Sequence, residues 1–341
     1  MAKATIDDVA DLAGVSIKTV SRVVNHEPNV RESTRQKVET AIARLNYKPN
    51  ISARNLASHR SHLIVLVYDD PGAYDTPSAG FVIRMQQGAL QACRASNCEL
   101  LIHPCNYRDR RVKSELTGLI ERTRPDGVVI AAPLSNMSSI VNAISATKVP
   151  FIRLSPGTKS LNEFSVGTND RAIAAEMTRY LASLGHKRIA FITGHSKHKA
   201  VANRLRGYKD GLQQAGLAFS EWLVANGDNS IRSGETAAAE LLSRDRAPTA
   251  IFAANDDMAA GVIRIANRLG ISVPGQLSVA GFDDSALARQ IYPALTTVRQ
   301  PLSEMAEKAA AALIGERQLE PGITVVEGEL KIRESTGAAP N

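Results

Sequence analysis

Long apolar runs, a secretory leader and an even set of cysteines are all missing from this 341-residue sequence. The longest apolar run, LIVLVY at Leu63–Tyr68, is far shorter than the roughly 18 residues that cross a bilayer, so it predicts a buried strand. The first residues, MAKATIDDVADLAGV, carry aspartates where a signal peptide needs a basic start and an apolar core. Three cysteines do not imply a disulfide framework. We therefore expect a cytoplasmic protein with reduced thiols and no membrane contact.

Motifs of common enzyme sites are also missing. The sequence has no G-x-x-x-x-G-K-[ST], no G-x-G-x-x-G and no G-x-S-x-G, so neither phosphate loops nor a nucleophile elbow are supported. His195 and His198, with His186 nearby, could suggest a metal site, but the segment HSKHK has no carboxylate or cysteine close by in sequence. We predict no enzyme activity, no cofactor and no metal.

Positive charge is concentrated at the N-terminus. The chain has 41 Lys and Arg against 34 Asp and Glu, a net charge of +7. Residues 1–60 hold ten of the basic and six of the acidic residues, so this short segment supplies +4 of the total. A basic head on a nearly neutral body indicates that the head meets an anion such as DNA. Charge alone would also fit an ordinary basic domain.

The pattern of apolar residues divides the chain into three parts. We predict a helical DNA-binding head at 1–49, a polar hinge or linker at 50–61, and a body at 62–341. The body alternates short apolar runs with amphipathic segments, which predicts parallel sheets with helices on both faces, in two lobes. The predicted strands are 63–67, 99–102, 127–132, 151–154, 188–193, 222–225, 250–254 and 277–282. The predicted helices are 80–96, 109–122, 137–147, 170–184, 203–215, 232–244, 257–269 and 303–314.

The head contains the pattern A-x-x-A-G-V-S-x-x-T-V-S-R-V-V-N, from Ala10 to Asn25. Thr5 can cap a first helix, Gly14 permits a tight turn, and Ser16 can cap a second helix. Valines of the second helix are expected to pack against the first helix. The outer face of the second helix is then suited to contact base edges in the major groove. That face consists of Ile17, Lys18, Ser21, Arg22 and Asn25. A plain helical hairpin with solvated charges is the alternative. A third helix is expected to start near Ser33-Thr34.

This head resembles that of the LacI/GalR family of bacterial repressors, in TIDDVADLAGVSIKTVSRVVN, RESTRQKVETAIARLNYKPN and SARNLAS. The resemblance implies that the helix from Ser16 to Asn25 reads operator DNA, with base contacts from Ile17, Lys18 and Arg22. It also implies a hinge that becomes helical on the operator, where Leu56 wedges into the minor groove and Ala53 is the small neighbour. Residues implied to contact the DNA backbone are Thr5, Ser16, Thr19, Ser21, Asn25, Thr34, Tyr47 and Asn50.

The body resembles the two-lobe effector domain of the same family, which is similar to periplasmic sugar-binding proteins. Three segments carry the likeness: NRLRGYKDGL, FAANDDMAAG and VAGFDDS. They imply that Arg204, Asn255, with Asp256 as a further candidate, and Asp283 bind the effector. Each segment lies at the C-terminal end of a predicted strand or at the start of the following helix, where open α/β sheets bind ligands. Helix capping is the alternative for Asn255 and Asp283.

Two positions depart from the family pattern. Many relatives stack an aromatic residue on the ligand where this chain has Asn229, and have an aspartate where it has Ser155. A sugar or glycoside is the expected effector, with Arg204 and Asp283 facing each other across it.

The sequence therefore predicts an effector-controlled repressor that binds double-stranded operator DNA as a homodimer, because a palindromic site needs two recognition helices. Release by an inducer is the first hypothesis, and activation by a corepressor or a partner protein is the second. A plain solute-binding protein would need a signal peptide and no reading head, which is the reverse of this sequence.

Overall fold

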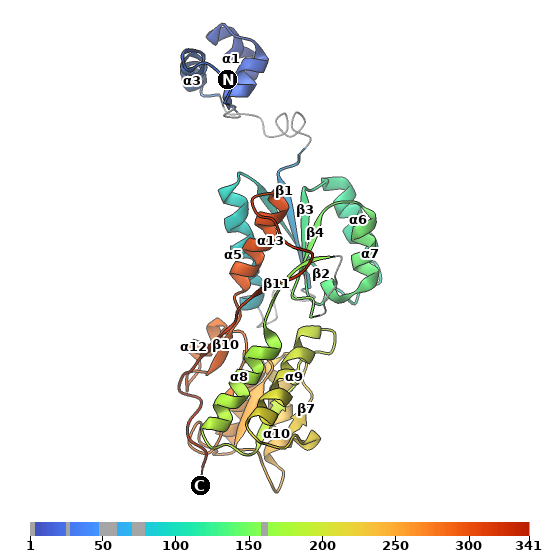
Figure 1. The fold of residues 1–341 in the computed structure, drawn as a ribbon, viewed down its shortest axis with the longest axis vertical. Helices are drawn as coiled ribbons and strands as arrows, with labels where there is room; N and C mark the ends of the chain where they lie inside the picture. Colours follow the sequence, from blue (N-terminus) through green and yellow to red (C-terminus); the bar gives the residue numbers. More distant parts are fainter. Residues whose placement is uncertain (1–3, 25–27, 48–59, 70–78, 158–162, 341) are drawn as a thin grey trace. The chain divides into compact units, whose positions relative to one another are not determined.

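The computed structural model describes residues 4–24, 28–47, 60–69, 79–157 and 163–340. The chain forms two compact units, Met1–Ser61 and His62–Asn341 (Figure 1). Among the described residues, no helix combines the length and the apolar character needed to cross a membrane.

The smaller unit is a cluster of three helices: α1 (Ile6–Ala13), α2 (Ile17–Val24) and α3 (Glu32–Leu45). Thr5 caps α1 in a capping box with Asp8, as its sequence predicts. Gly14 ends α1 with a left-handed φ of 65°, where a side chain would be strained. Helix α3 begins at Glu32, slightly before the predicted start. The core of this unit consists of Val9, Ala10, Val20, Val23, Val38, Ala41 and Tyr47.

The larger unit begins with an N-terminal lobe built on a six-stranded parallel sheet of order β11-β5-β4-β3-β1-β2. Its strands are β1 (Leu63–Asp69), β2 (Glu99–Cys105), β3 (Gly127–Ala131), β4 (Phe151–Leu154), β5 (Phe164–Thr168) and β11 (Gly322–Val326). Helices α5 (Ala79–Ala95) and α13 (Leu302–Ile314) cover one face, while α6 (Val112–Thr123) and α7 (Ser138–Ala146) cover the other (Figure 1). The central strands are buried on both sides, which is why they are almost continuously apolar.

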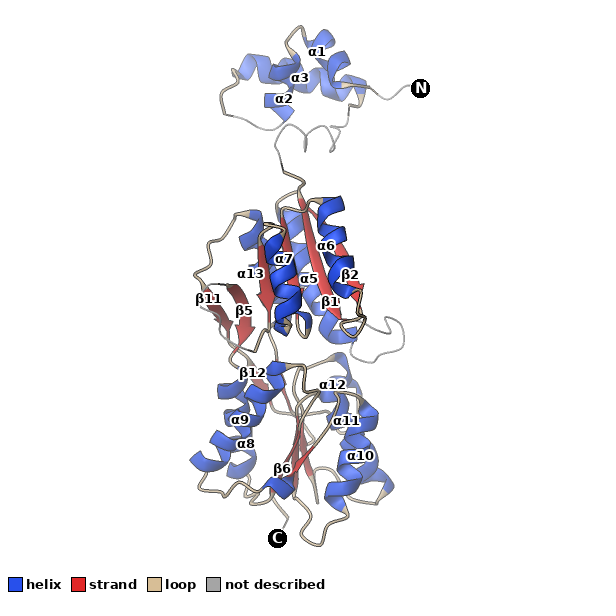
Figure 2. Ribbon diagram, turned by 90° about the vertical axis from the view of Figure 1, so that its right-hand side faces the viewer, coloured by secondary structure: helices blue, strands red, loops and turns tan. Residues whose placement is uncertain are grey.

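The C-terminal lobe has a four-stranded parallel sheet of order β7-β6-β8-β9 between two pairs of helices (Figure 2). The strands are β6 (Ile189–Ile192), β7 (Val224–Ala225), β8 (Ala250–Ala253) and β9 (Ser278–Ala280). The helices are α8 (Asp170–Ser183) and α9 (Lys199–Gln214) on one face, and α10 (Ile231–Leu242) and α11 (Asp256–Arg268) on the other. Short elements complete the lobe: α12 (Ala286–Gln290) and the antiparallel pair β10 (Thr297–Arg299) and β12 (Glu329–Lys331).

The chain crosses between the lobes three times: from β5 to α8, from β10 to α13 and from β11 to β12. Hydrogen bonds join the first and last crossings, since Thr168 donates to the carbonyl of Val326 at 2.8 Å. The amide of Gly328 also donates to Asn169 Oδ1 at 2.9 Å. These three crossings connect the lobes, and segments that follow the carboxyl ends of the strands lie near them.

Most predicted elements are present, but the sequence analysis missed β5, β10, β11, β12 and α12. These are short, and four of them adjoin the crossings, where neither face carries a long apolar run. The predicted strand at 222–225 is a 3₁₀ turn followed by only two strand residues. Helix α9 starts at Lys199, four residues before the predicted start at 203.

Candidate DNA-reading surface and effector site

Helix α2 presents a polar face away from the head core. Val20 and Val23 are buried, whereas Ser16, Ile17 and Lys18 are exposed at its N-terminal end. Ile17 is 48% exposed, which leaves a large apolar side chain beside the lysine. The Ser16 hydroxyl accepts a hydrogen bond from the amide of Thr19 at 3.2 Å and thereby caps the helix. This end of α2 has the chemistry of a base-reading surface.

The remaining predicted DNA contacts are distributed over the head. Thr19, Ser21, Arg22 and Thr34 are half-buried, and Thr5 is exposed but also acts as the cap of α1. The Tyr47 side chain packs into the head core. Asn25, Asn50, Ala53 and Leu56 lie outside the described residues, so the predicted hinge and its leucine wedge stay predictions.

In the body, Arg204 is the centre of a buried charge cluster. Its Nε donates to Asp170 Oδ1 at 2.8 Å, its Nη1 donates to the carbonyl of Ala254 at 2.6 Å, and its guanidinium lies 3.7 Å from the centre of the Phe282 ring. Arg204 is 7% exposed and Asp170 is 6% exposed. A buried ion pair of this kind needs further hydrogen bonds and packing, and the carbonyl and the ring supply them.

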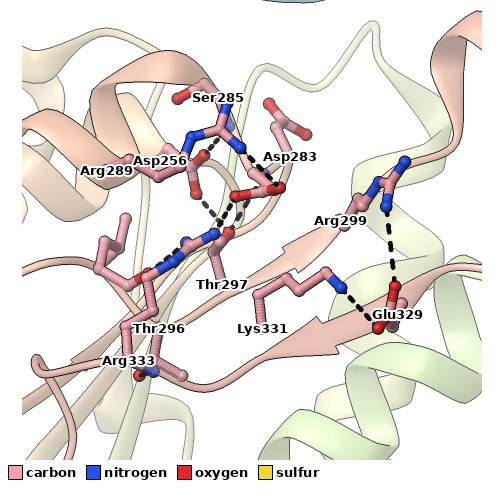
Figure 3. A network of polar contacts seen from close by, with 12 residues as sticks. Asp256, Asp283, Ser285, Arg289, Thr296, Thr297, Arg299, Glu329, Lys331 and Arg333 are labelled. Atoms are coloured by element: carbon pink, nitrogen blue, oxygen red, sulfur yellow. Dashed lines mark hydrogen bonds and ion pairs between the residues drawn. The ribbon is translucent and has the colours of Figure 1, made fainter.

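Two more carboxyl groups, those of Asp256 and Asp283, lie in the same cluster. Asp256 accepts hydrogen bonds from the Thr297 hydroxyl at 2.5 Å and the Ser285 amide at 2.7 Å (Figure 3). Asp283 accepts one from the Gln300 side-chain amide and lies 3.7 Å from Arg204. Burial raises the pKa of both carboxyls, and their proximity raises that of Asp256 further, while Arg204 acts against the increase at Asp283.

The expectation that Arg204 and Asp283 face each other across a ligand is wrong. Both belong to the C-terminal lobe, and 3.7 Å between Nη1 and Oδ1 leaves no room for a sugar ring. The reason is that α9, which carries Arg204, follows β6, and Asp283 follows β9 of the same sheet. Asn255 performs the alternative role of helix cap: its Oδ1 accepts from the amide of Met258 at 3.0 Å, and its Nδ2 donates to the carbonyl of Asn229 at 2.9 Å.

Side chains from the N-terminal lobe meet this cluster from across the boundary. Arg84, on α5, donates to the backbone carbonyls of Asp283 and Asp284. A cavity of about 30 Å³ lies there, lined by Gly80, Phe81, Arg84, Asp256, Asp257, Asp283, Ser285 and Leu302. This volume is large enough for a water molecule but far below the roughly 300 Å³ of a small-molecule pocket. A sugar would enter here only after side chains from both lobes move.

A second group of contacts joins the lobes through the HSKHK segment. His195 Nε2 lies 3.2 Å from the Tyr107 hydroxyl, and Arg108 Nε donates to that hydroxyl at 3.0 Å. Burial lowers the pKa of His198 to about 4, so its ring is neutral. In the described part of the chain, no three His, Cys, Asp or Glu side chains are grouped to hold a metal ion.

The two positions that depart from the family pattern have left-handed backbones, with φ of 75° at Asn229 and 48° at Ser155. Asn229 accepts a hydrogen bond from the amide of His195 at 3.3 Å. Ser155 is 8% exposed and its hydroxyl has no partner among the described residues. Sequence reasoning missed Arg84, Asp170 and Gln300, because each comes from a segment distant along the chain and belongs to no motif. Phe282 lies inside VAGFDDS and could have been found there.

Comparison with known proteins identifies the family. Residues 5–50 match the model described as bacterial regulatory proteins, lacI family, and residues 178–336 match a periplasmic binding protein-like domain. The HTH-type transcriptional regulator GalR of Escherichia coli (strain K12) is 35% identical over 351 residues, covering 99% of this chain and 97% of that protein. The chain belongs to the lacI family of bacterial regulatory proteins. It is therefore a DNA-binding transcription regulator, and the predicted fold class is confirmed.

Other transcription regulators are also similar along nearly the whole chain. The HTH-type transcriptional regulator DegA of Bacillus subtilis (strain 168) is 34% identical, with 98% of both chains covered. Among solved structures, the lac repressor dimer bound to operator and the anti-inducer ONPF has a TM-score of 0.79 at 28% identity, covering 99% of this chain and all of that one. The transcriptional regulator CelR–cellobiose complex has a TM-score of 0.74 at 30% identity, covering 98% of this chain and all of that one.

Proposed function

We propose that this protein is a sequence-specific repressor that binds operator DNA as a homodimer in the cytoplasm and releases it when a sugar or glycoside binds between the lobes. The observation that carries the effector part is the buried cluster of Arg204 and Asp283 at the lobe boundary. Their groups can donate to and accept from sugar hydroxyls with charge-assisted hydrogen bonds. The family members solved with operator, with ONPF and with cellobiose support DNA, a dimer and a carbohydrate-like effector.

The geometry also supports a role for both residues on one side of the ligand. Because Arg204 and Asp283 are neighbours in the C-terminal lobe, a sugar would contact them together while the N-terminal lobe closes on its other face. A ligand changes operator affinity only by the difference in its affinity for the two arrangements of the lobes. Asn255, as a cap at the same strand ends, would hold the start of α11 in place beside the ligand.

The test begins by selecting an operator from a random DNA pool with the purified protein and measuring its affinity by fluorescence anisotropy. Each sugar of a panel that includes cellobiose is then added. We expect an effective sugar to weaken operator binding roughly 5- to 150-fold. Asp283→Ala should bind the operator normally and lose the response, while the half-buried control Asp210→Ala keeps it.

Two other outcomes would change the proposal. A sugar that tightens operator binding would make the protein a corepressed regulator, which is the second candidate function. Asp283→Ala that still responds with unchanged sugar affinity would remove Asp283 from the site. Sedimentation velocity tests the dimer, since a monomer on the selected palindromic operator would contradict it.

A further inference from the structure

Arg84, on α5 of the N-terminal lobe, contacts the backbone beside the charge cluster of the other lobe. Its Nη1 donates to the carbonyl oxygen of Asp283 at 3.1 Å, and its Nη2 donates to the carbonyl oxygen of Asp284. In the described part of the chain, no carboxylate forms an ion pair with Arg84, although the side chain is half-buried. Both Nη atoms of the guanidinium thus donate to the carbonyls of two consecutive residues.

The carbonyls that Arg84 contacts belong to two consecutive residues with unusual backbone angles. Asp283 has a φ of 119° and Asp284 a φ of 50°. Such conformations are unfavourable for non-glycine residues, so the surroundings must hold them. Within the C-terminal lobe, the amide of Asp283 donates to the carbonyl of Val298 at 2.7 Å, and Arg333 binds the carboxylate of Asp284 at 2.5 Å. Arg84 supplies the contact from the opposite lobe.

Asp283 therefore faces two environments at once. Its carboxylate accepts a hydrogen bond from Gln300 and lies beside Arg204, where we propose that the sugar binds. Its carbonyl, on the same residue, meets Arg84. A ligand that draws the carboxylate to a new position rotates the adjoining peptide groups, so the distance between the carbonyl and Arg84 changes too.

A shift of Arg84 would spread through the N-terminal lobe because its helix, α5, packs tightly on α13. A Cβ atom added to Gly88 of α5 would lie 1.8 Å from the carbonyl oxygen of Ser303 on α13, so the two backbones are in direct contact. Helices that approach this closely move together, since packed interiors do not deform continuously. Helix α13 also follows directly after Gln300, the other partner of Asp283.

We propose that Arg84 is a positioning residue that holds the Asp283–Asp284 backbone and couples occupancy of the effector site to the arrangement of the two lobes. This inference rests on the proposed function, because it takes Asp283 as a ligand contact. In this proposal Arg84 follows the position of the Asp283 and Asp284 carbonyls, and α5 together with α13 transmits its displacement to the N-terminal lobe.

The test is hydrogen–deuterium exchange of the full-length protein without ligand, for wild type, Arg84→Ala, Arg84→Lys and Arg94→Ala. Arg94 is the matched control because it is an exposed arginine on the same helix. We expect the amides of 283–285 to exchange about tenfold faster in Arg84→Ala, partly to recover in Arg84→Lys, and to stay as in wild type in Arg94→Ala. Strand β6 should not change. Unchanged exchange at 283–285, or equally faster exchange throughout the body, would overturn the inference.

The second readout separates coupling from folding. With a sugar to which wild type responds, Arg84→Ala should bind the sugar with a Kd within about threefold of wild type while its operator response falls below about twofold. A full response in Arg84→Ala would show that the lobes communicate by another route and would overturn the coupling role. If wild type responds to no sugar, the proposed effector class fails, and the exchange experiment still decides whether Arg84 holds the loop.

Discussion

The guanidinium of Arg204 lies between two carboxylates, with Asp170 at 2.8 Å and Asp283 at 3.7 Å. The closer carboxylate begins α8, immediately after a crossing between the lobes, and the more distant one follows β9. Arg204 is therefore both a structural ion-pair partner and the neighbour of the proposed ligand contact. Asp170 pairs with Arg204 but is not a proposed ligand contact. Substitutions of Asp170 therefore test the role of Arg204 in stability separately from its role in ligand binding.

Asp170→Asn should lower the free energy of unfolding of the body by about 3 kcal/mol, because it leaves a buried guanidinium without its closest charge partner. Urea denaturation at neutral pH measures the change. The control is Asp210→Asn, whose partner Arg171 is 61% exposed, and no measurable loss is expected there. An equal loss of unfolding free energy in both variants would show that burial does not make the Arg204–Asp170 ion pair contribute more to stability than the Arg171–Asp210 pair.

Asp256 should make the body less stable as the pH rises. Burial and the nearby Asp283 raise the pKa of its carboxyl above the ordinary 3.8. The folded body keeps this proton where the unfolded chain has lost it, so the stabilisation is complete below about pH 4 and declines as the pH rises above that value. Asp256→Asn cannot ionise but can still accept from the Ser285 amide.

Urea denaturation of wild type and Asp256→Asn between about pH 5 and pH 8 tests this sign. The stability of the variant relative to wild type should increase steadily with pH. A constant difference over that range would mean that Asp256 has an ordinary pKa in the folded protein.

His195 should titrate below its ordinary value and carry its hydrogen on Nε2. The amide of Lys197 donates to Nδ1 at 3.2 Å, so Nδ1 is the acceptor and Nε2–H donates to the Tyr107 hydroxyl. Burial lowers the pKa of His195 from 6.5, and Arg108 lowers it further. The contribution of His195 to stability is therefore complete above pH 6.5 and is lost as the pH falls below it.

An NMR titration of the histidine ring signals measures this pKa directly. Arg108→Gln should raise it toward 6.5, whereas Arg111→Gln, whose arginine pairs with Asp109 instead, should leave it unchanged. A wild-type value at or above 6.5 would contradict the neutral contact between the lobes.

Arg22→Ala should cost about 1–3 kcal/mol on the selected operator and relax sequence preference, if this arginine contacts a base as predicted. Anisotropy titrations against the operator and against random duplex DNA measure the ratio of the two affinities. Arg44→Ala, at the exposed C-terminal turn of α3, is the control. A drop of the same factor on both DNAs would reassign Arg22 to phosphate contact.

Gly88→Ala should destabilise the body by about 1–3 kcal/mol, because its new Cβ would meet backbone atoms of Ser303, which cannot rotate away. Gly118→Ala is the matched control in a helix, since the nearest atom to its new Cβ is the flexible Arg122 Nη1 at 3.2 Å. Alanine has the higher helix propensity, so the control should gain up to about 1 kcal/mol by thermal or urea unfolding. A similar gain in Gly88→Ala would show that α5 and α13 can separate at little cost.

Features that depend on neighbours along the chain could be predicted from the sequence. The capping box of Thr5, the turn at Gly14 and the valine stripe of α2 are local patterns, and they predicted the head correctly. The alternating runs predicted both parallel sheets, because strands buried on two faces must be apolar along their length. The motifs around Arg204 and Asp283 likewise located the charged cluster at the ends of strands.

Which distant residues meet in this cluster depends on the folded arrangement of the chain. The cluster is contacted by Asp170 at the start of α8, by Gln300 after β10, and by Arg84 on α5 of the other lobe. No spacing in the sequence links these residues to Arg204 or Asp283. Tertiary contacts also placed Arg204 beside Asp283 and assigned Asn255 to a helix cap. The strands β5, β10, β11 and β12 were missed for the same reason: their strand conformation is held by pairing with remote segments, which outweighs weak local preference.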